Sequence, residues 1–290
     1  MLLVTGITGL TGRFLFDIIK KNDGLKSVRF LIRKTSDISW VSHQKPDFFC
    51  GDVISVDELV KCMEGVESVI HLVNIRYSPQ VIEACIEKGV KRVIFVNTTG
   101  MYSKYQEYSN LYKQLENKIL NSQLDYTIIR PTMIYGNHLD KNIHKLIKLL
   151  AKLPVFPVVG DGSSLMQPVY AGDLARVIYL AYKNKVAIGK DYNVAGKKPL
   201  SYKILLKEIA GALNKRVYFI NIPYSLAIFG GKIGNLFPNS LVNLEKIQRL
   251  SEDKVFDYSK ARDELGFNPI SFQQGIRLEV MELKRAGILS

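Results

Sequence analysis

The first thirteen residues contain the groups best suited to holding a phosphate. Gly6, Gly9 and Gly12 follow a short apolar run at 2–4, and apolar residues then recur at helical spacing from Phe14. A strand, a tight turn and a helix start bring bare backbone N–H groups and the positive end of the helix dipole to one place, where a pyrophosphate can bind. Glycine is needed because a side chain would block the phosphate or hold the helix away from the strand. The spacing predicts a dinucleotide-binding turn; the alternative is an ordinary tight turn of an α/β protein.

Two cations stand at the end of the second expected strand. The apolar segment 28–32 is followed directly by Arg33 and Lys34. At this place in dinucleotide-binding folds a carboxylate suits the ribose hydroxyls of NAD, whereas cations suit the extra phosphate of NADP. The residues therefore favour NADP(H), with NAD as second choice; the alternative is that both side chains are simply solvated.

A carboxylate follows the third expected strand. Residues 47–50 are predicted to form this strand, and Asp52 lies in the turn after it. Its carboxylate either bonds to the adenine amino group of a cofactor or ties down the turn. Ser55 is predicted to cap the next helix, because serine side chains accept hydrogen bonds from the first free N–H groups of helices.

Strands and helices alternate along the first two thirds of the chain. Apolar segments at 69–73, 92–96 and 126–130 are predicted strands, separated by helices near 79–88 and 110–120. This alternation indicates an α/β protein with a doubly wound parallel sheet.

The C-terminal part is predicted to be mostly helical. Asp173 is expected to cap the helix that follows it, at 174–182. The helices are expected at 174–182, 202–213, 224–229 and 241–250, with a strand at 217–222.

The composition is that of a globular protein with excess positive charge. The 290 residues carry a formal charge of +13, which favours anionic partners such as nucleotides, nucleotide sugars or an acidic membrane surface. Lysine and arginine are scattered rather than gathered in a tail, so a solvated basic surface is favoured over a nucleic-acid groove. No apolar run is long enough to span a membrane, and no charged region precedes Leu2 as in a signal peptide, so a cytoplasmic location is expected.

The three cysteines, Cys50, Cys62 and Cys85, show no spacing typical of a metal site or a disulfide framework. Each lies in an apolar neighbourhood, so buried thiols are expected. We predict no metal site.

Several segments together resemble one family, the extended and atypical short-chain dehydrogenase/reductases of the NAD-dependent epimerase/dehydratase type. They are VTGITGLTGR (4–13), GDVISVDEL (51–59), VESVIHLV (66–73), TIIRPTMIYG (127–136), GDGSSLMQPVYAGDLA (160–175) and DYSKARDELGF (257–267). The resemblance extends over nearly the whole chain. It implies a Rossmann domain that binds NAD(P) and a smaller, mostly helical C-terminal lobe that closes over a substrate.

We accordingly expect a dinucleotide-binding core at 1–136, with 167–196 returning to it, and a substrate lobe at 137–166 and 197–290. The residues expected to contact the cofactor are Gly6, Thr8, Gly9, Leu10, Gly12, Arg33, Lys34, Asp52, Val53 and Pro131.

The family's hydride-transfer chemistry uses a tyrosine and a lysine four residues later. A phenol with its ordinary pKa near 10 is a poor base at neutral pH, and an adjacent ammonium favours the phenolate. Here the pair is not intact, because the residue four before Lys113 is Ser109 and the residue four after Tyr108 is Tyr112. The resemblance implies Tyr108 as acid/base and Lys113 as a ribose contact; the alternative is that the tyrosines only pack over the pocket.

A hydroxyl at the end of the fifth strand completes the family's catalytic group. Thr98 (or Thr99) matches the Ser/Thr that holds the substrate oxygen; the alternative is a hydroxyl that bonds only to local backbone. Sugar 4,6-dehydratases of the family carry an Asp-Glu pair just after this threonine, where the chain has Thr99 and Gly100. The sequence therefore argues against dehydration.

The predicted function is an NAD(P)-dependent reductase or epimerase acting by hydride transfer on a small carbonyl, hydroxyl or sugar compound. Family members that act on nucleotide sugars often carry an arginine after the Asp-Gly turn, where 165–167 has none. Lys141 or Lys145 could serve instead. A homodimer is compatible with the sequence, and no nucleic-acid partner is expected.

Two further interpretations stay open. The broken tyrosine–lysine spacing motivates a non-catalytic NADP(H)-binding regulator or assembly protein. The apolar run 224–237, with its basic surroundings, motivates peripheral membrane association; burial of this run in the small lobe is favoured over it.

Overall fold

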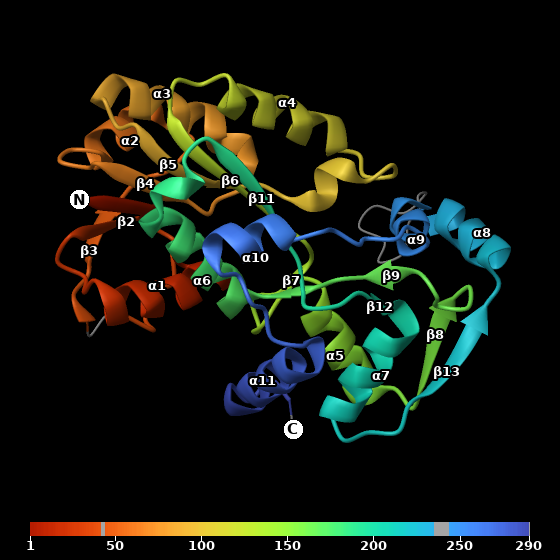
Figure 1. Ribbon diagram of the computed structural model, residues 1–290. Helices are drawn as coiled ribbons and strands as arrows, with labels where there is room; N and C mark the ends of the chain where they lie inside the picture. The colour runs from red at the N-terminus through yellow and green to blue at the C-terminus, as the bar shows by residue number, and fades with distance from the viewer. Residues whose placement is uncertain (42–43, 235–243, 290) are drawn as a thin grey trace.

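A central sheet of seven parallel strands organises the computed structural model, which describes residues 1–41, 44–234 and 244–289 (Figure 1). The strand order is β11-β6-β5-β4-β1-β2-β3. In that order the strands are Lys190–Val194, Asp125–Pro131, Arg92–Val96, Ser68–His71, Leu2–Thr5, Val28–Ile32 and Asp47–Cys50. Chain order reverses at β1, and ligands of such sheets bind at the carboxyl ends of the strands beside this reversal.

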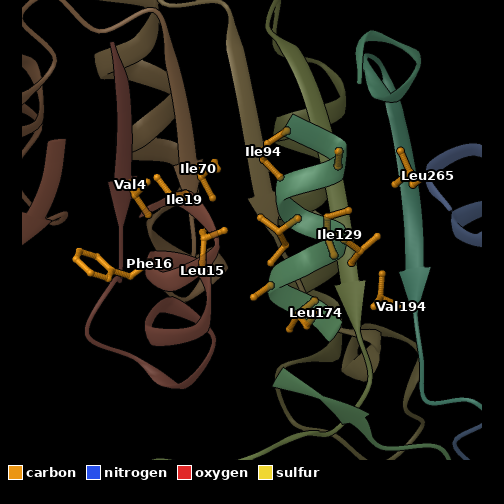
Figure 2. Packing of buried hydrophobic residues seen from close by; sticks show 14 of the residues in the cluster. Val4, Leu15, Phe16, Ile19, Ile70, Ile94, Ile129, Leu174, Val194 and Leu265 are labelled. Carbon is orange, nitrogen blue, oxygen red and sulfur yellow. The ribbon is translucent and has the colours of Figure 1, made fainter. Parts of the chain in front are cut away.

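Helices cover both faces of the sheet, which confirms the doubly wound fold. One face carries α1 (Leu10–Asn22), α6 (Ala171–Lys183) and α10 (Ser259–Leu265). The other face carries α2 (Val56–Cys62), α3 (Ser78–Lys88) and α4 (Ser109–Leu120). Figure 2 shows Leu15 and Ile19 of α1 pointing toward Val4 and Ile70 of the sheet, all fully buried. The strands that are covered on both faces, such as β1 and β5, consist mostly of apolar residues, as the sequence had indicated.

A second group of elements lies beyond the carboxyl edge of the sheet (Figure 1). Its longer members are α5 (Ile143–Lys152), β8 (Val155–Val159), α7 (Tyr202–Ala212), β13 (Tyr218–Ile222), α8 (Tyr224–Gly234), α9 (Leu244–Leu250) and α11 (Phe272–Arg285). The short elements of the chain are η2 (Ile75–Tyr77), η3 (Thr99–Tyr102), β7 (Ile134–Tyr135), β9 (Leu165–Met166), β10 (Val169–Tyr170), η4 (Lys185–Ala187) and β12 (Leu200–Ser201). α5, β8, α7 and α11 share a third apolar core. The domain boundaries expected from the sequence stay a prediction.

Two local predictions are wrong. Asp173 does not cap α6, because the helix begins at Ala171; its buried carboxylate instead accepts from the Ile270 N–H at 2.8 Å. Cys50 is exposed, whereas Cys62 and Cys85 are buried as expected. Cys50 ends β3, the edge strand of the sheet, and only one neighbouring strand covers it. Ser55 does cap α2, accepting from the Glu58 N–H.

The expected burial of the apolar run 224–237 is also wrong where it is described. Tyr224, Leu226 and Phe229 are exposed along α8, which continues past the predicted end to Gly234. Phe237 lies outside the described residues. The helix predicted at 241–250 is described from Leu244, and its first three residues lie outside the described part.

A buried acid in α11 makes a pH-dependent contribution to stability. Burial raises the pKa of Glu279 from 4.5 to about 9, and the nearby Asp140 carboxylate adds to this. Because this pKa is higher in the folded than in the unfolded chain, the contribution is complete below pH 4.5 and is lost as the pH rises to about 9. We expect Glu279→Gln to remove a slope in the free energy of unfolding of up to about 1.4 kcal/mol per pH unit.

Urea unfolding at a series of pH values measures this slope. Glu87→Gln, at an exposed position on α3, is the matched control and is expected to keep the wild-type slope. An unchanged pH dependence in Glu279→Gln contradicts the assignment of the proton to this side chain.

Candidate functional site

The glycine turn after β1 is packed too tightly for side chains. Gly6 has φ +81, a conformation that favours glycine, and a Cβ there would lie 3.1 Å from the backbone N of Val73. A Cβ on Gly12 would lie 2.4 Å from the carbonyl oxygens of both Gly6 and Ile7. The third glycine therefore allows α1 to pack directly against the end of β1.

The start of α1 offers uncapped N–H groups. Gly9 is the N-cap, in an extended conformation, and no side chain in the described residues caps the helix. No acidic residue occupies the first turn, so the positive end of the helix dipole is not neutralised locally. Thr8 and Leu10 flank the cap and are partly buried. The glycine turn leaves no room for a Cβ, and the first N–H groups of α1 are uncapped. Together they fit the pyrophosphate of a dinucleotide.

The end of β2 presents the two predicted cations to solvent. Arg33 and Lys34 are both exposed, and within the described ranges neither side chain forms an ion pair. The Arg33 N–H donates to Ser36 Oγ at 3.0 Å, which fixes the turn. Arg13, from the first turn of α1, lies 3.4 Å from Asp37. The sequence reasoning missed Arg13 as a third cation at this corner.

The turn after β3 holds its carboxylate by local bonds. Asp52 Oδ1 accepts from the Ile54 N–H at 3.1 Å, so the turn-tying alternative describes what the structure shows. A contact of Asp52 with adenine stays a prediction. Val53 and Pro131, the other predicted contacts, are buried at the carboxyl ends of β3 and β6.

The tyrosine–lysine pair is separated by the helix register. Tyr108 is the N-cap of α4 and is exposed, and its ring centroid lies 6.5 Å from that of Tyr112. Tyr112 is buried in the core beneath α4, whereas Lys113 is exposed. Neighbouring helical residues point about 100° apart, so Lys113 leaves the face that Tyr108 and Tyr112 share.

An arginine supplies the positive charge beside Tyr108. Arg76 Cζ lies 4.0 Å from the centroid of the Tyr108 ring. Arg76 belongs to η2, which follows β4, and Asn74 caps η2 by accepting from the Arg76 N–H. The sequence reasoning missed this residue, although a cation soon after a parallel strand was a signal available for it.

The two threonines after β5 have different partners. Thr98 is the N-cap of η3, and its Oγ1 accepts from the Gly100 N–H at 3.0 Å. Thr99 is buried and its Oγ1 donates to the Pro131 carbonyl at 3.1 Å. Because η2 and η3 both pack against α4, Thr98, Arg76 and Tyr108 come from three segments that meet at the carboxyl edge of the sheet.

A buried ion pair anchors α4 to the sheet. Arg130 of β6 contacts Glu116 of α4 at 2.5 Å and also bonds to Asp191 of β11. Asn97, at the end of β5, donates to the same Glu116 carboxylate. This network fixes the helix that carries Tyr108, since a buried ion pair keeps its geometry only while each partner is satisfied.

His71 and a hollow in the second group of elements lie apart from Thr98 and Tyr108. His71 is fully buried and hydrogen-bonded to Thr5 at 2.8 Å, and burial lowers its pKa to about 4. No cluster of metal-ligating residues occurs in the described part of the chain. A hollow of about 470 Å³ lies beside the Gly160–Leu165 turn, and neither Thr98 nor Tyr108 lines it.

A family model matches the region that contains this site. The model described as "NAD dependent epimerase/dehydratase family" matches residues 2–195. It covers all seven strands of the sheet, the glycine turn and the segment that contains Thr98, Tyr108 and Lys113.

Curated relatives share a quarter or less of their residues with the chain. An N-acetyl-alpha-D-glucosaminyl-diphospho-ditrans,octacis-undecaprenol 4-epimerase of Escherichia coli O157:H7 is 24% identical over 81% of this chain and 83% of its own length. The 3beta-hydroxysteroid-dehydrogenase/decarboxylase isoform 1 of Arabidopsis thaliana is 23% identical over 79% of this chain, which spans 65% of that protein.

Solved structures share the fold over the full chain. A UDP-glucose 4-epimerase with UDP-glucose from Thermotoga maritima has a TM-score of 0.77 at 18% identity, covering 98% of this chain and 99% of its own. PA4631, a nucleoside-diphosphate-sugar epimerase from Pseudomonas aeruginosa, has a TM-score of 0.81 at 17% identity, covering 100% and 99%. At these identities the likeness concerns the fold.

Proposed function

We propose, for a chain that belongs to the NAD-dependent epimerase/dehydratase family, that it is an NAD(P)-dependent epimerase or reductase of a sugar hydroxyl. The observation that carries the proposal is the contact of Arg76 with the Tyr108 ring, 4.0 Å from Cζ to the ring centroid, at the sheet edge where Thr98 follows β5. An acid/base phenol, a cation and an orienting hydroxyl are the groups that oxidation of an alcohol to a ketone requires.

The proton steps fall to the chain's own residues. A bound nicotinamide supplies the acceptor and donor of hydride. Acting as the phenolate, Tyr108 takes the proton of the sugar hydroxyl as the C–H bond breaks. The resulting phenol returns that proton to the ketone oxygen when hydride adds back to the carbon. Addition to the opposite face of the ketone gives the epimer. Arg76 stabilises the negative charge that develops on the phenol oxygen, and Thr98 orients the substrate oxygen.

Lys113 has no part in this proposal as the partner of Tyr108. Its exposed position, one residue beyond the buried Tyr112, directs it off the shared face of α4. Its predicted contact with the ribose stays a prediction that requires a local change at the start of the helix.

A sugar diphosphate is the substrate class that fits best. The Escherichia coli relative is by name an epimerase of a sugar diphosphate carried on a polyprenol, and the chain's charge of +13 favours an anionic substrate. No arginine follows the Asp161–Gly162 turn, so we assign the diphosphate to Lys141 or Lys145 at the start of α5, both of which are exposed.

The same geometry supports a second function. Burial of Tyr112 at the position of the family's lysine favours a protein that kept the nucleotide site and lost the reaction. Such an NADP(H)-binding regulator or assembly protein would bind the dinucleotide and turn over no sugar. Turnover of any sugar that depends on Tyr108 excludes it.

We propose NADP(H) as the cofactor because Arg33 and Lys34 are exposed at the end of β2. Arg13 lies nearby, paired with Asp37. Replacing Arg33 with alanine is expected to weaken NADPH binding by about 10- to 100-fold, since a charge-assisted hydrogen bond contributes about 1.5 to 3 kcal/mol. NADH binding is expected to stay within about twofold, since NADH lacks the extra phosphate. Titrations of both nucleotides measure the two changes, and a larger wild-type affinity for NADH contradicts the proposal.

Conversion of a small panel of sugars tests the function. The panel comprises UDP-glucose, UDP-N-acetylglucosamine and a polyprenyl-diphospho-N-acetylglucosamine, each with NADP and NAD, with epimers resolved by NMR. Appearance of an epimer supports the proposal. Tight dinucleotide binding with no conversion of any panel member, and no oxidation of reduced cofactor by a panel of small carbonyls, favours the regulator. The homodimer, the cytoplasmic location and the substrate lobe stay predictions.

A further inference from the structure

A two-stranded ribbon in the second group of elements has an apolar outer face. β8 and β13 pair in parallel, with Val155 opposite Tyr218 and Pro157 opposite Ile220. Phe156 and Val158, which alternate with these residues, are buried in the third core. The outward residues are exposed, and Tyr218 exposes 71% of its surface. A solvent-facing strand face is ordinarily polar, so an apolar one needs a separate explanation.

Exposed apolar residues also occur in the segments before and after the ribbon in the chain. Leu149 and Leu153 are exposed at the end of α5, immediately before β8. Leu226 and Phe229 are 58% and 62% exposed on α8, which follows β13 after Pro223. The β8–β13 ribbon and α8 both lie at the end of the molecule that is far from β3 (Figure 1). We call this surface the apolar end: Leu149, Leu153, Val155, Pro157, Tyr218, Ile220, Leu226 and Phe229.

The segments that form the apolar end carry only positive charge. Residues 141–160 and 209–232 contain no aspartate and no glutamate. Their cations are Lys141, Lys145, Lys148, Lys152, Lys215, Arg216 and Lys232. Lys152 and Arg216 are exposed within the same stretches of chain as Leu153 and Tyr218. Exposed apolar and aromatic side chains flanked by lysine are the composition of surfaces that enter the headgroup region of an anionic bilayer.

We propose that the apolar end docks the protein on the surface of an anionic membrane. Leu226, Phe229 and Ile220 enter the boundary between headgroups and acyl chains, and Tyr218 lies at the headgroup level, where aromatic rings with a polar tip are favoured. Lys148, Lys152 and Arg216 contact lipid phosphates. The contact is peripheral: among the helices that the structure describes, none is long and apolar enough to cross a bilayer.

Charge favours a membrane over a second copy of the chain as the occupant. In a two-fold dimer the same patch meets itself, so each copy would bring Lys148, Lys152 and Arg216 against the identical cations, with no carboxylate in 141–160 or 209–232 to neutralise them. Like charges in such an interface repel. Anionic headgroups supply the missing negative charge.

Vesicle co-sedimentation tests the apolar contribution. The protein is expected to bind phosphatidylcholine vesicles that contain phosphatidylglycerol, and to bind pure phosphatidylcholine at least about fivefold more weakly. Ile220→Ser/Phe229→Ser is expected to weaken binding to the mixed vesicles more than about tenfold. Ile54→Ser, an equally exposed apolar position beside the sheet, is the matched control and is expected to bind as wild type.

A charge-reversed pair tests the electrostatic contribution. Lys148→Glu/Lys152→Glu is expected to weaken binding more than about tenfold, at about fivefold for each lysine. Lys26→Glu/Lys185→Glu changes the net charge equally at exposed positions outside the apolar end and is expected to have a smaller effect. An unchanged dinucleotide-induced thermal shift shows that each variant is folded.

Three results overturn the proposal. The first is no binding of the wild type to the mixed vesicles, and the second is binding that Ile220→Ser/Phe229→Ser leaves unchanged. The third is a wild-type dimer in sedimentation velocity that the same substitutions dissociate, because the apolar end is then an interface between copies. Vesicle binding is measured without any substrate. A negative result therefore contradicts membrane docking and leaves the proposed enzymatic function untouched.

Discussion

Replacing Gly12 with valine is expected to abolish dinucleotide binding and to destabilise the protein. The added Cβ would lie 2.4 Å from the carbonyl oxygens of Gly6 and Ile7. Both atoms are backbone, so no side-chain rotation relieves the overlap, and α1 must move away from β1. We expect the free energy of unfolding to fall by about 3 kcal/mol, as for severe overpacking, and the affinity for NADPH to fall more than about 100-fold because the N–H groups of the turn move with the helix.

Gly211→Ala is the matched control, because a Cβ at that helical position of α7 meets nothing within 4 Å. It is expected to bind NADPH as wild type and to be slightly more stable, since alanine favours helix over glycine. Isothermal titration gives the affinity and urea unfolding the stability. A Gly12→Val protein that binds NADPH normally would contradict the assignment of the turn.

Replacing Tyr108 with phenylalanine is expected to lower kcat on an active sugar by a factor of about 10² to 10⁴, the usual contribution of a general acid/base. The substitution removes only the phenol oxygen and keeps the ring that contacts Arg76 at 4.0 Å. KM is expected to change little, because proton transfer is needed in the transition state and not for binding. Steady-state kinetics on the substrate found in the panel give both constants.

Tyr105→Phe is the control for Tyr108, because Tyr105 is similarly exposed in the same segment. It is expected to keep the wild-type kcat. Arg76→Gln is expected to lower kcat by a smaller factor than Tyr108→Phe, since it removes charge stabilisation and leaves the acid in place. Full activity of Tyr108→Phe would remove this phenol from the mechanism.

The sequence alone predicted those features that depend on local pattern. The alternation of apolar strands with helices gave the sheet, and the spacing of Gly6, Gly9 and Gly12 gave the turn, because both are set by residues close in the chain. The 100° step between helical neighbours also indicated that Lys113 cannot stand in for position 112, which agrees with the buried Tyr112 and exposed Lys113.

Features that depend on contacts between distant segments were not predicted. Arg76 and Tyr108 meet because η2 packs against α4, and no pattern in either segment names its partner. The sequence predicted Asp173 as a helix cap, but its carboxylate accepts from the N–H of Ile270, which lies far along the chain. Burial also depends on distant segments. α8 is apolar in sequence, yet Leu226 and Phe229 are exposed, because no element among the described residues covers them.

The most direct test of the proposed hydride transfer is epimerisation in deuterated water. Hydride that leaves a sugar carbon for the nicotinamide and returns to the other face never exchanges with solvent, so we expect an epimer without deuterium at the inverted carbon. Mass spectrometry and NMR of the product give the answer. An epimer that carries solvent deuterium at that carbon would show removal of a proton instead of hydride and would contradict the proposed hydride transfer.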